Sequence, residues 1–311
     1  MKYNLISIVG PTATGKTGLG TRLAQKLNGE ILSADSRQVY KFMDIGTGKD
    51  LEEYTIDGNL IPYHLIDVAL PEEEFDLFHY QKLFYKTLAK IRANRHIPLL
   101  VGGTGMYISA VIQNYDLVEV DFNSRYAREL MEKPEDELKK ILFSKTKKHH
   151  NTTDLLEKER IIKAIIVAEG KGNYPESKRE IHSLNICVDT PPDIVRDRIK
   201  KRLASRLEQG MVEEVQALLD MGISHEKLRF FGLEYRYLSM YLAGEINYND
   251  MFQKLYSAIS QFAKRQRTWF RKIERDGVVL HRISGPDFEA AYDIIIKNIK
   301  NFEFEDDFIT G

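Results

Sequence analysis

YNLISIVGPTATGKTGLGTRLAQKLNG, residues 3–29, contains a strand pattern, a loop motif and a helix pattern in succession. Tyr3 to Gly10 is nearly continuous in apolar and β-rich residues, as buried parallel strands are. Leu19, Leu23 and Leu27 recur every four residues, which predicts a helix. Between them, GPTATGKT matches the phosphate-binding pattern G-x-x-x-x-G-K-[ST] at every defined position.

The alternation of strand and helix patterns continues and predicts an α/β fold of the P-loop NTPase type, with a doubly wound parallel sheet. A long helix is expected from Tyr248 to Arg275. Further strands are expected at EILSADS (30–36), IPYHLIDV (61–68), IPLLVGGTG (97–105), SLNICVD (183–189) and VVLHRI (278–283), and another helix at FDLFHYQKLFYKTLAKIRANR (75–95).

Residues 121–182 differ from the rest of the chain, because they are charged and helix-prone and contain no continuous apolar strand. We therefore expect an inserted helical subdomain there. Residues 1–120 and 183–311 then form the P-loop core with its C-terminal helices.

Bulk composition narrows the range of functions. The chain has 311 residues and a formal net charge of −1, so contact with nucleic acid requires a local basic patch. Cys187, the single cysteine, lies in an apolar run and is expected in the core. No apolar run approaches the roughly 20 residues of a membrane-spanning helix, and the start does not resemble a signal peptide. We expect a cytoplasmic protein with no membrane partner.

The loop motif predicts a site for phosphate or diphosphate. Glycines let backbone N–H groups converge on an anion, and the following helix adds its partial positive charge. Lys16 supplies a point charge, and Thr17 offers a hydroxyl to Mg²⁺. A glycine-rich turn that matches by chance is the alternative. The candidate phosphate-binding residues are Gly10, Pro11, Thr12, Ala13, Thr14, Gly15, Lys16 and Thr17.

Most proteins with this loop bind ATP or GTP, and an Asp at the end of a buried strand holds their magnesium ion. Here the strand at 97–105 ends in GGTG and offers no carboxylate, which counts against a motor or switch but not against a small-molecule kinase. The remaining acid is Asp35, at the end of the second strand. Since ligands bind outside the carboxyl ends of such strands, Asp35 should face the loop, although it could instead cap a turn.

Four motifs together carry a family resemblance: GPTATGKT, ADSRQVYKFMDIGTGK, PLLVGGTGMYISAV and AKRQRTWFRK. In this order and spacing they resemble the tRNA dimethylallyltransferases, the isopentenyltransferase family, over roughly residues 4 to 283. The resemblance implies transfer of a dimethylallyl group from dimethylallyl diphosphate to the exocyclic N6 amine of the adenosine 3′-adjacent to the anticodon. The diphosphate in the loop is then a leaving group, Mg²⁺ is the cofactor, and tRNA, through its anticodon stem-loop, is the partner of a monomer.

The resemblance also implies roles for individual residues. Asp35 matches the general base, with Lys16 and Thr17 acting on the leaving group, while the insertion is expected to bind tRNA. Arg125 matches a tRNA-contacting position or is a solvated surface charge. The other residues implied to contact tRNA are Ser36, Arg37, Gln38 and Thr104, together with Lys264, Arg267 and Arg271 on the basic face of the long helix.

Two motifs depart from the family pattern. The insertion reads EKERIIKAIIVAEG in place of D-P-x-R-x-x-R-A-L-E, which keeps Arg160 as a tRNA-binding candidate and has Lys163 in place of the second arginine. RFFGLEYR has two extra residues relative to R-x-x-G-Y-[RK]. The family's diphosphate-binding arginine is therefore matched by Arg229 through its position, or by Arg236 through the local YR.

Three alternatives remain at this point. The same transfer could use free AMP, ADP or ATP as acceptor. The chain could be a P-loop kinase of small molecules with Asp35 as the base, or an RNA-binding protein with little catalysis. The basic long helix and the long insertion favour tRNA.

Overall fold

The computed structural model describes residues 3–117, 122, 124–145, 158–169, 180–298 and 300. The chain forms two compact units, one of Met1–Tyr115 with Arg179–Gly311 and one of Asp116–Lys178. The insertion predicted from the sequence spans 121–182, so the two sets of boundaries differ by a few residues.

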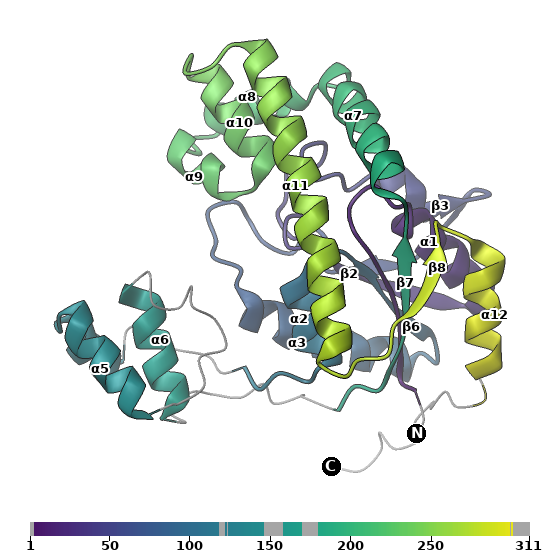
Figure 1. Ribbon diagram of the computed structural model, residues 1–311, viewed down its shortest axis with the longest axis horizontal. Helices are drawn as coiled ribbons and strands as arrows, with labels where there is room; N and C mark the ends of the chain where they lie inside the picture. The colour runs from purple at the N-terminus through teal and green to yellow at the C-terminus, as the bar shows by residue number, and fades with distance from the viewer. Residues whose placement is uncertain are drawn as a thin grey trace. The chain divides into compact units, whose positions relative to one another are not determined.

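A six-stranded parallel sheet lies at the centre of the larger unit (Figure 1), as the sequence predicted. Its order is β5-β2-β6-β1-β7-β8, so the strand that precedes the P-loop lies inside the sheet. All residues of β1, β2 and β6 are buried, which explains the largely apolar sequences of β1 and β6. The strands are β1 (Leu5–Val9), β2 (Gly29–Ala34), β5 (Tyr63–His64), β6 (Ile97–Gly102), β7 (Ser183–Asp189) and β8 (His281–Ser284), and a separate hairpin joins β3 (Thr55–Ile56) to β4 (Asn59–Leu60).

The strand expected at 61–68 shrinks to the two residues of β5. Pro62, directly before it, has no N–H for a ladder hydrogen bond. Leu65 and Asp67, after it, adopt positive φ angles of 67° and 55°, which turn the chain out of the sheet.

Helices cover both faces of the sheet. Alternate strand residues such as Ile6 and Ile8 pack with α1 (Lys16–Leu27) and α12 (Phe288–Asn298) on one face. Leu5 and Cys187 belong to the core of the opposite face, so the cysteine is buried as expected. That face is covered by α2 (Leu77–Ala93), α3 (Gly105–Ile112), α7 (Pro192–Glu208) and α11 (Tyr248–Arg275), the last with the bounds expected from the sequence.

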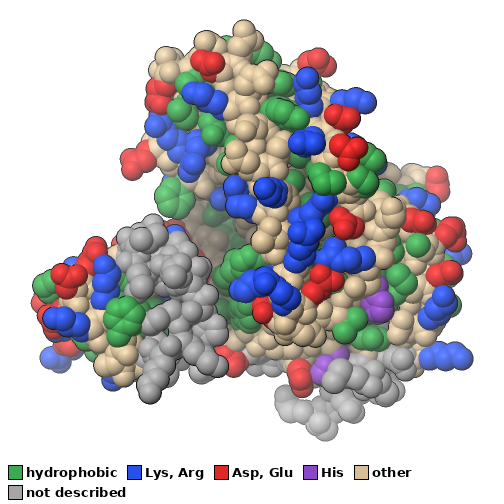
Figure 2. Space-filling view, in the orientation of Figure 1, with side chains coloured by type: hydrophobic (Ala, Val, Ile, Leu, Met, Phe, Trp, Pro, Cys, Tyr) green, Lys and Arg blue, Asp and Glu red, His purple; other side chains and the backbone are tan. Residues whose placement is uncertain are grey.

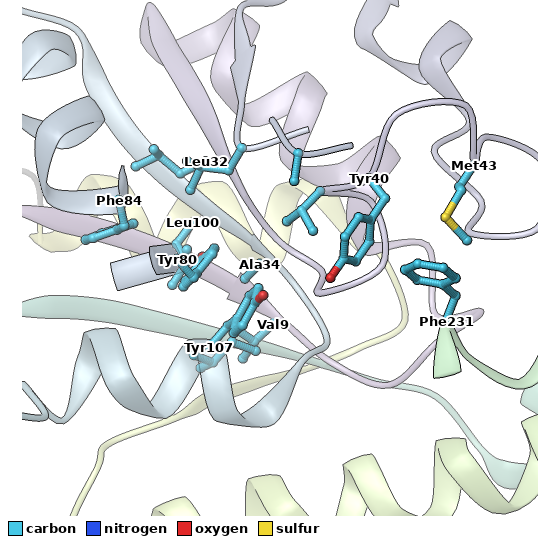
Figure 3. Close-up of a cluster of buried hydrophobic side chains, with 14 of the residues drawn as sticks. Val9, Leu32, Ala34, Tyr40, Met43, Tyr80, Phe84, Leu100, Tyr107 and Phe231 are labelled. Carbon is cyan, nitrogen blue, oxygen red and sulfur yellow. The ribbon is translucent and has the colours of Figure 1, made fainter. Parts of the chain in front are cut away.

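An aromatic cluster fixes the carboxyl ends of the strands (Figure 3). Tyr80 of α2 stacks on Tyr107 of α3 with ring centroids 3.7 Å apart, and its hydroxyl donates to the Ser33 carbonyl at 3.0 Å. Beyond β2, Tyr40 meets Phe231 edge-on at 4.9 Å. These contacts tie the segment after β2 to the helices that surround it.

Short helices complete this end of the larger unit: η1 (Leu51–Tyr54), α8 (Met211–Asp220), α9 (His225–Phe230) and α10 (Leu233–Leu242). Glu214 of α8 accepts hydrogen bonds from the backbone N–H groups of Asp44, Ile45 and Gly46 and from the Tyr235 hydroxyl. One carboxylate therefore holds the loop that precedes η1.

The smaller unit contains α4 (Arg125–Met131), α5 (Glu135–Lys145) and α6 (Lys158–Ala168). These helices bury a core of their own, which includes Leu130, Leu138 and Ile162. In neither unit does the described chain contain a helix long and apolar enough to cross a membrane.

Candidate active site

A cavity of about 520 Å³ opens where the strands β1, β2 and β6 end. Residues from the P-loop (Thr12, Lys16, Thr17), from the end of β2 (Asp35) and from the end of β6 (Thr104) line it together. Motifs that are far apart in the sequence thus meet in one chamber, as expected for a site at the carboxyl edge of a parallel sheet.

The P-loop is shaped for an anion. Ala13 and Gly15 adopt left-handed φ angles of 61° and 83°, which turn the loop between β1 and α1. The ammonium group of Lys16 donates to the Pro11 carbonyl at 3.2 Å. Burial lowers the pKa of Lys16 to about 8, against the opposing effect of the nearby Asp35 carboxylate. A cation that is withdrawn from water in this way is a strong site for a diphosphate.

Gln266 of α11 connects the P-loop to the end of β6. Its Oε1 accepts from the Thr12 N–H at 2.9 Å, and its Nε2 donates to the Gly103 carbonyl at 2.8 Å. A Cβ atom at position 103 would lie 2.6 Å from that Nε2, so only glycine leaves room for the amide. The Gln266 side chain is buried, and it also lines the cavity.

Arg202 of α7 lies against the P-loop and was not among the sequence predictions. Its Nη2 donates to the Thr12 hydroxyl at 2.6 Å, and burial lowers its pKa to about 10. One turn later, Arg206 pairs with Asp50 through contacts of 2.7 and 2.9 Å. Glu234 lines the same region, and burial raises the pKa of its carboxyl group. The sequence signal that could have identified these arginines is their spacing of four residues in RDRIKKRLASR, which places them on one face of a helix.

Asp35 both caps a turn and lines the cavity. Its Oδ1 accepts from the Arg37 N–H at 3.0 Å. The Ser36 N–H donates to the Thr104 hydroxyl at 3.0 Å, and that hydroxyl donates to the Ser36 Oγ at 3.3 Å. The two interpretations of Asp35 that the sequence offered are therefore compatible.

Other predicted residues complete this wall. Gln38 donates to the Gly48 carbonyl at 2.9 Å and accepts from the Ser33 hydroxyl at 3.1 Å. Arg229 and Arg236 also line the cavity. Arg229 pairs with Glu245, and Arg236 donates to the Arg229 carbonyl at 3.4 Å.

The two arginines of the RFFGLEYR motif thus have partners away from the P-loop. The arginine that the structure shows bonded to the P-loop threonine is Arg202. The sequence alternatives for a diphosphate-binding arginine, Arg229 and Arg236, line the cavity, and the contacts described for them are with residues outside the P-loop.

The basic face of α11 lies outside the cavity. Lys264 and Arg271 are exposed, while Arg267 pairs with Asp189 at 3.5 Å and donates to the Thr190 carbonyl. Figure 2 shows Lys and Arg side chains gathered over α11. The face that lines the cavity carries Ile259, Phe262, Arg265, Gln266 and Trp269 instead.

The remaining two predicted arginines belong to the smaller unit. Arg125, which is 91% exposed, pairs with Glu129 at 2.9 Å along α4. Arg160 is exposed on α6.

Few protein groups could ligate a metal ion here. Within the described ranges, no three or more His, Cys, Asp or Glu side chains form a group that could hold one. Thr17, beside Lys16 in the cavity, offers one hydroxyl. This donor set fits Mg²⁺, which keeps several waters and binds through substrate phosphates with one or two protein ligands.

Comparison with known proteins agrees with these features. The model of the family described as IPP transferase matches residues 38–273. The chain is 47% identical over 306 residues to tRNA dimethylallyltransferase 1 of Syntrophus aciditrophicus, covering 97% of this chain and 100% of that one. It is 49% identical over 290 residues to tRNA dimethylallyltransferase 1 of Geotalea uraniireducens, covering 92% and 94%. The full-length tRNA isopentenylpyrophosphate transferase of Bacillus halodurans has a similar structure, with a TM-score of 0.67, 30% identity and coverage of 96% and 95%.

Proposed function

The chain belongs to the IPP transferase family, and from this membership we propose its complete reaction. It transfers a dimethylallyl group from dimethylallyl diphosphate to the N6 amine of the adenosine 3′-adjacent to the anticodon in tRNA. Diphosphate is the second product. The observation that carries this proposal is that Asp35 and the P-loop line one cavity.

The P-loop side of the cavity is assigned to the donor. As the bond between C1 and the bridging oxygen breaks, negative charge grows on the diphosphate. Lys16 and Arg202, both partly buried, stabilise that charge without reorganising water. Mg²⁺ would supply further positive charge at the diphosphate, with Thr17 as its protein ligand.

The β2 and β6 side is assigned to the acceptor. The N6 lone pair of adenine is delocalised into the ring, so the amine must lose a proton as the new N6–C1 bond forms. Asp35 accepts this proton, while Ser36 and Thr104 hold the segment in place. The target base has to leave its stack to reach this depth.

The site favours neither alternative function. A kinase would transfer a single phosphoryl group to its substrate, whereas in the proposed reaction the diphosphate leaves intact. Transfer to free nucleotides keeps the same mechanism, but the family match and the chain's separate helical unit favour tRNA. We assign the exposed Arg125 and Arg160 of that unit to tRNA phosphates.

We further propose that the enzyme acts as a monomer in the cytoplasm. The P-loop and Asp35, which the proposed chemistry requires, meet in one cavity of this chain.

The test is an incubation of unmodified tRNA, dimethylallyl diphosphate and Mg²⁺, with mass spectrometry of the digested tRNA. Wild type should add one five-carbon unit to an adenosine. Asp35→Asn should lower kcat by about 10²- to 10⁴-fold without weakening donor binding, since a positioned base contributes that much. Asp57→Asn is the matched control, because Asp57 is exposed in a turn outside the cavity. Transfer only to AMP, ADP or ATP would overturn the acceptor, and phosphorylated products would overturn the reaction.

A further inference from the structure

Phe230 is the most exposed large hydrophobic side chain in the described part of the chain, with 75% of its surface accessible. It is the last residue of α9, whose Leu228 faces inward and is fully buried. The next residue, Phe231, is also buried and packs against Tyr40. Because Leu228 and Phe231 point inward, the Phe230 side chain is left exposed to solvent, and it lines the cavity.

A second aromatic ring reaches the cavity from another element. Phe262 of α11 is 38% exposed, and the Arg265 guanidinium lies 5.8 Å from its ring centroid. Arg229 and Arg236 line the cavity together with Phe230. We call these two phenylalanines and three arginines the aromatic rim.

This combination fits unpaired nucleotides. Single-stranded RNA is recognised by stacking of its bases on exposed aromatic rings and arginine planes, while arginines also attract its phosphates. The five-carbon tail of the donor would call for a buried apolar wall rather than rings in solvent. An apolar protein surface would offer no negative charge to the three arginines of the aromatic rim, so it fits this region less well than RNA does.

We propose that Phe230 and Phe262 stack on the nucleobases that flank the target adenosine, with the rim arginines at the adjoining phosphates. The inference rests on the proposed function, because flipping the adenosine into the cavity leaves its neighbours without a stacking partner. Phe230 lies in RFFGLEYR, the motif in which this chain departs from the family pattern.

Steady-state kinetics of Phe230→Ala, Phe230→Tyr and Phe262→Ala test the proposal. Each alanine variant should raise the KM for tRNA about 5- to 150-fold, the range found when a stacking ring is removed. The KM for dimethylallyl diphosphate should stay within about twofold, and Phe230→Tyr, which keeps a ring, should behave like wild type. Phe42→Ala is the control, because Phe42 is 50% exposed and lies outside the cavity lining. An unchanged KM for tRNA, or a rise confined to the donor KM, would overturn the stacking.

A binding measurement separates this inference from the proposed function. An anticodon stem-loop with 2-aminopurine beside the target adenosine should lose fluorescence on binding Asp35→Asn protein, since stacking quenches this base. Introducing Phe230→Ala as a second substitution in this protein should remove most of the fluorescence quench. If the quench depends on Phe230 but the wild-type protein prenylates no tRNA, the proposed reaction is wrong and the stacking is supported. If the wild-type protein prenylates tRNA but the quench is unchanged when either ring is removed, the stacking is wrong and the proposed reaction is supported.

Discussion

Lys16 shows how burial sets the pH range of the donor site. Its ammonium group is withdrawn from water, which lowers its pKa to about 8, and the neighbouring Arg202 contributes to the lowering. Arg202, with a pKa of about 10, keeps its proton under conditions where Lys16 loses its own. Between pH 7.5 and 9.5, the charge of Lys16 therefore changes more than the charge of Arg202.

We expect donor affinity to fall as pH rises through 8. Only protonated Lys16 offers a full charge to diphosphate, so the Kd of dimethylallyl diphosphate should rise by up to about tenfold for each pH unit above 8. Calorimetric titration of the wild-type protein without tRNA measures this directly, because it keeps the Asp35 carboxylate that acts on the pKa of Lys16. Lys16→Arg keeps its charge to higher pH and should show a much flatter profile. The same steep profile in both proteins would show that another group titrates.

The position of the P-loop and of Asp35 in the cavity could be predicted because their neighbours in the chain define the ends of the strands that they follow. GPTATGKT is local, and Asp35 directly follows a buried strand. Arg202 could not be ranked above the other cations of α7, since its importance comes from a contact with Thr12, 190 residues away in sequence. Contacts of this range depend on the fold as a whole.

Among the secondary-structure elements, the long helix α11 and the central strands were predictable, as was the short strand β8, whereas the short helix α9 was not. The strands β1 and β6 are almost wholly apolar, and β2 and β7 have apolar centres, because helices cover both faces of the sheet. α11 has 28 residues, enough for its periodicity to stand out. α9 has only six, too few for a periodic pattern, and depends on the packing of Leu228 and Phe231.

The long helix α11 is tied to the site through Gln266, and replacing this side chain should disturb donor and acceptor together. Gln266→Met keeps the approximate volume but leaves the Thr12 N–H and the Gly103 carbonyl unpaired, which costs about 1–3 kcal/mol of stability. Because the P-loop and the end of β6 then lose their link, we expect kcat/KM to fall about 10- to 100-fold.

Thermal unfolding and kinetics of the same preparation check both parts. Gln261→Met is the matched control, because Gln261 is an exposed glutamine on the same helix. Loss of stability with unchanged kinetics would show that Gln266 supports the fold without positioning the substrates.

At the scale of the whole molecule, the two units have separate cores, and the described residues that line the cavity lie in the larger one. The chain also leaves and rejoins the larger unit at adjacent points. Asn114 donates to the Ile181 carbonyl at 3.0 Å and accepts from the Ile181 N–H at 2.7 Å. A short linker can therefore replace the insertion at a small cost in loop entropy.

Replacing residues 118–178 by a short Gly/Ser linker should separate the two substrates. We expect the remaining protein to unfold cooperatively and to bind dimethylallyl diphosphate with a Kd within about threefold of wild type, since its P-loop and α7 are intact. Its affinity for tRNA should fall at least about tenfold, because the basic side chains of the smaller unit are removed with it. Calorimetry with the donor and filter binding with tRNA measure the two effects in one preparation. Unchanged tRNA affinity would show that the aromatic rim and the larger unit recognise tRNA unaided, so that the insertion has another role.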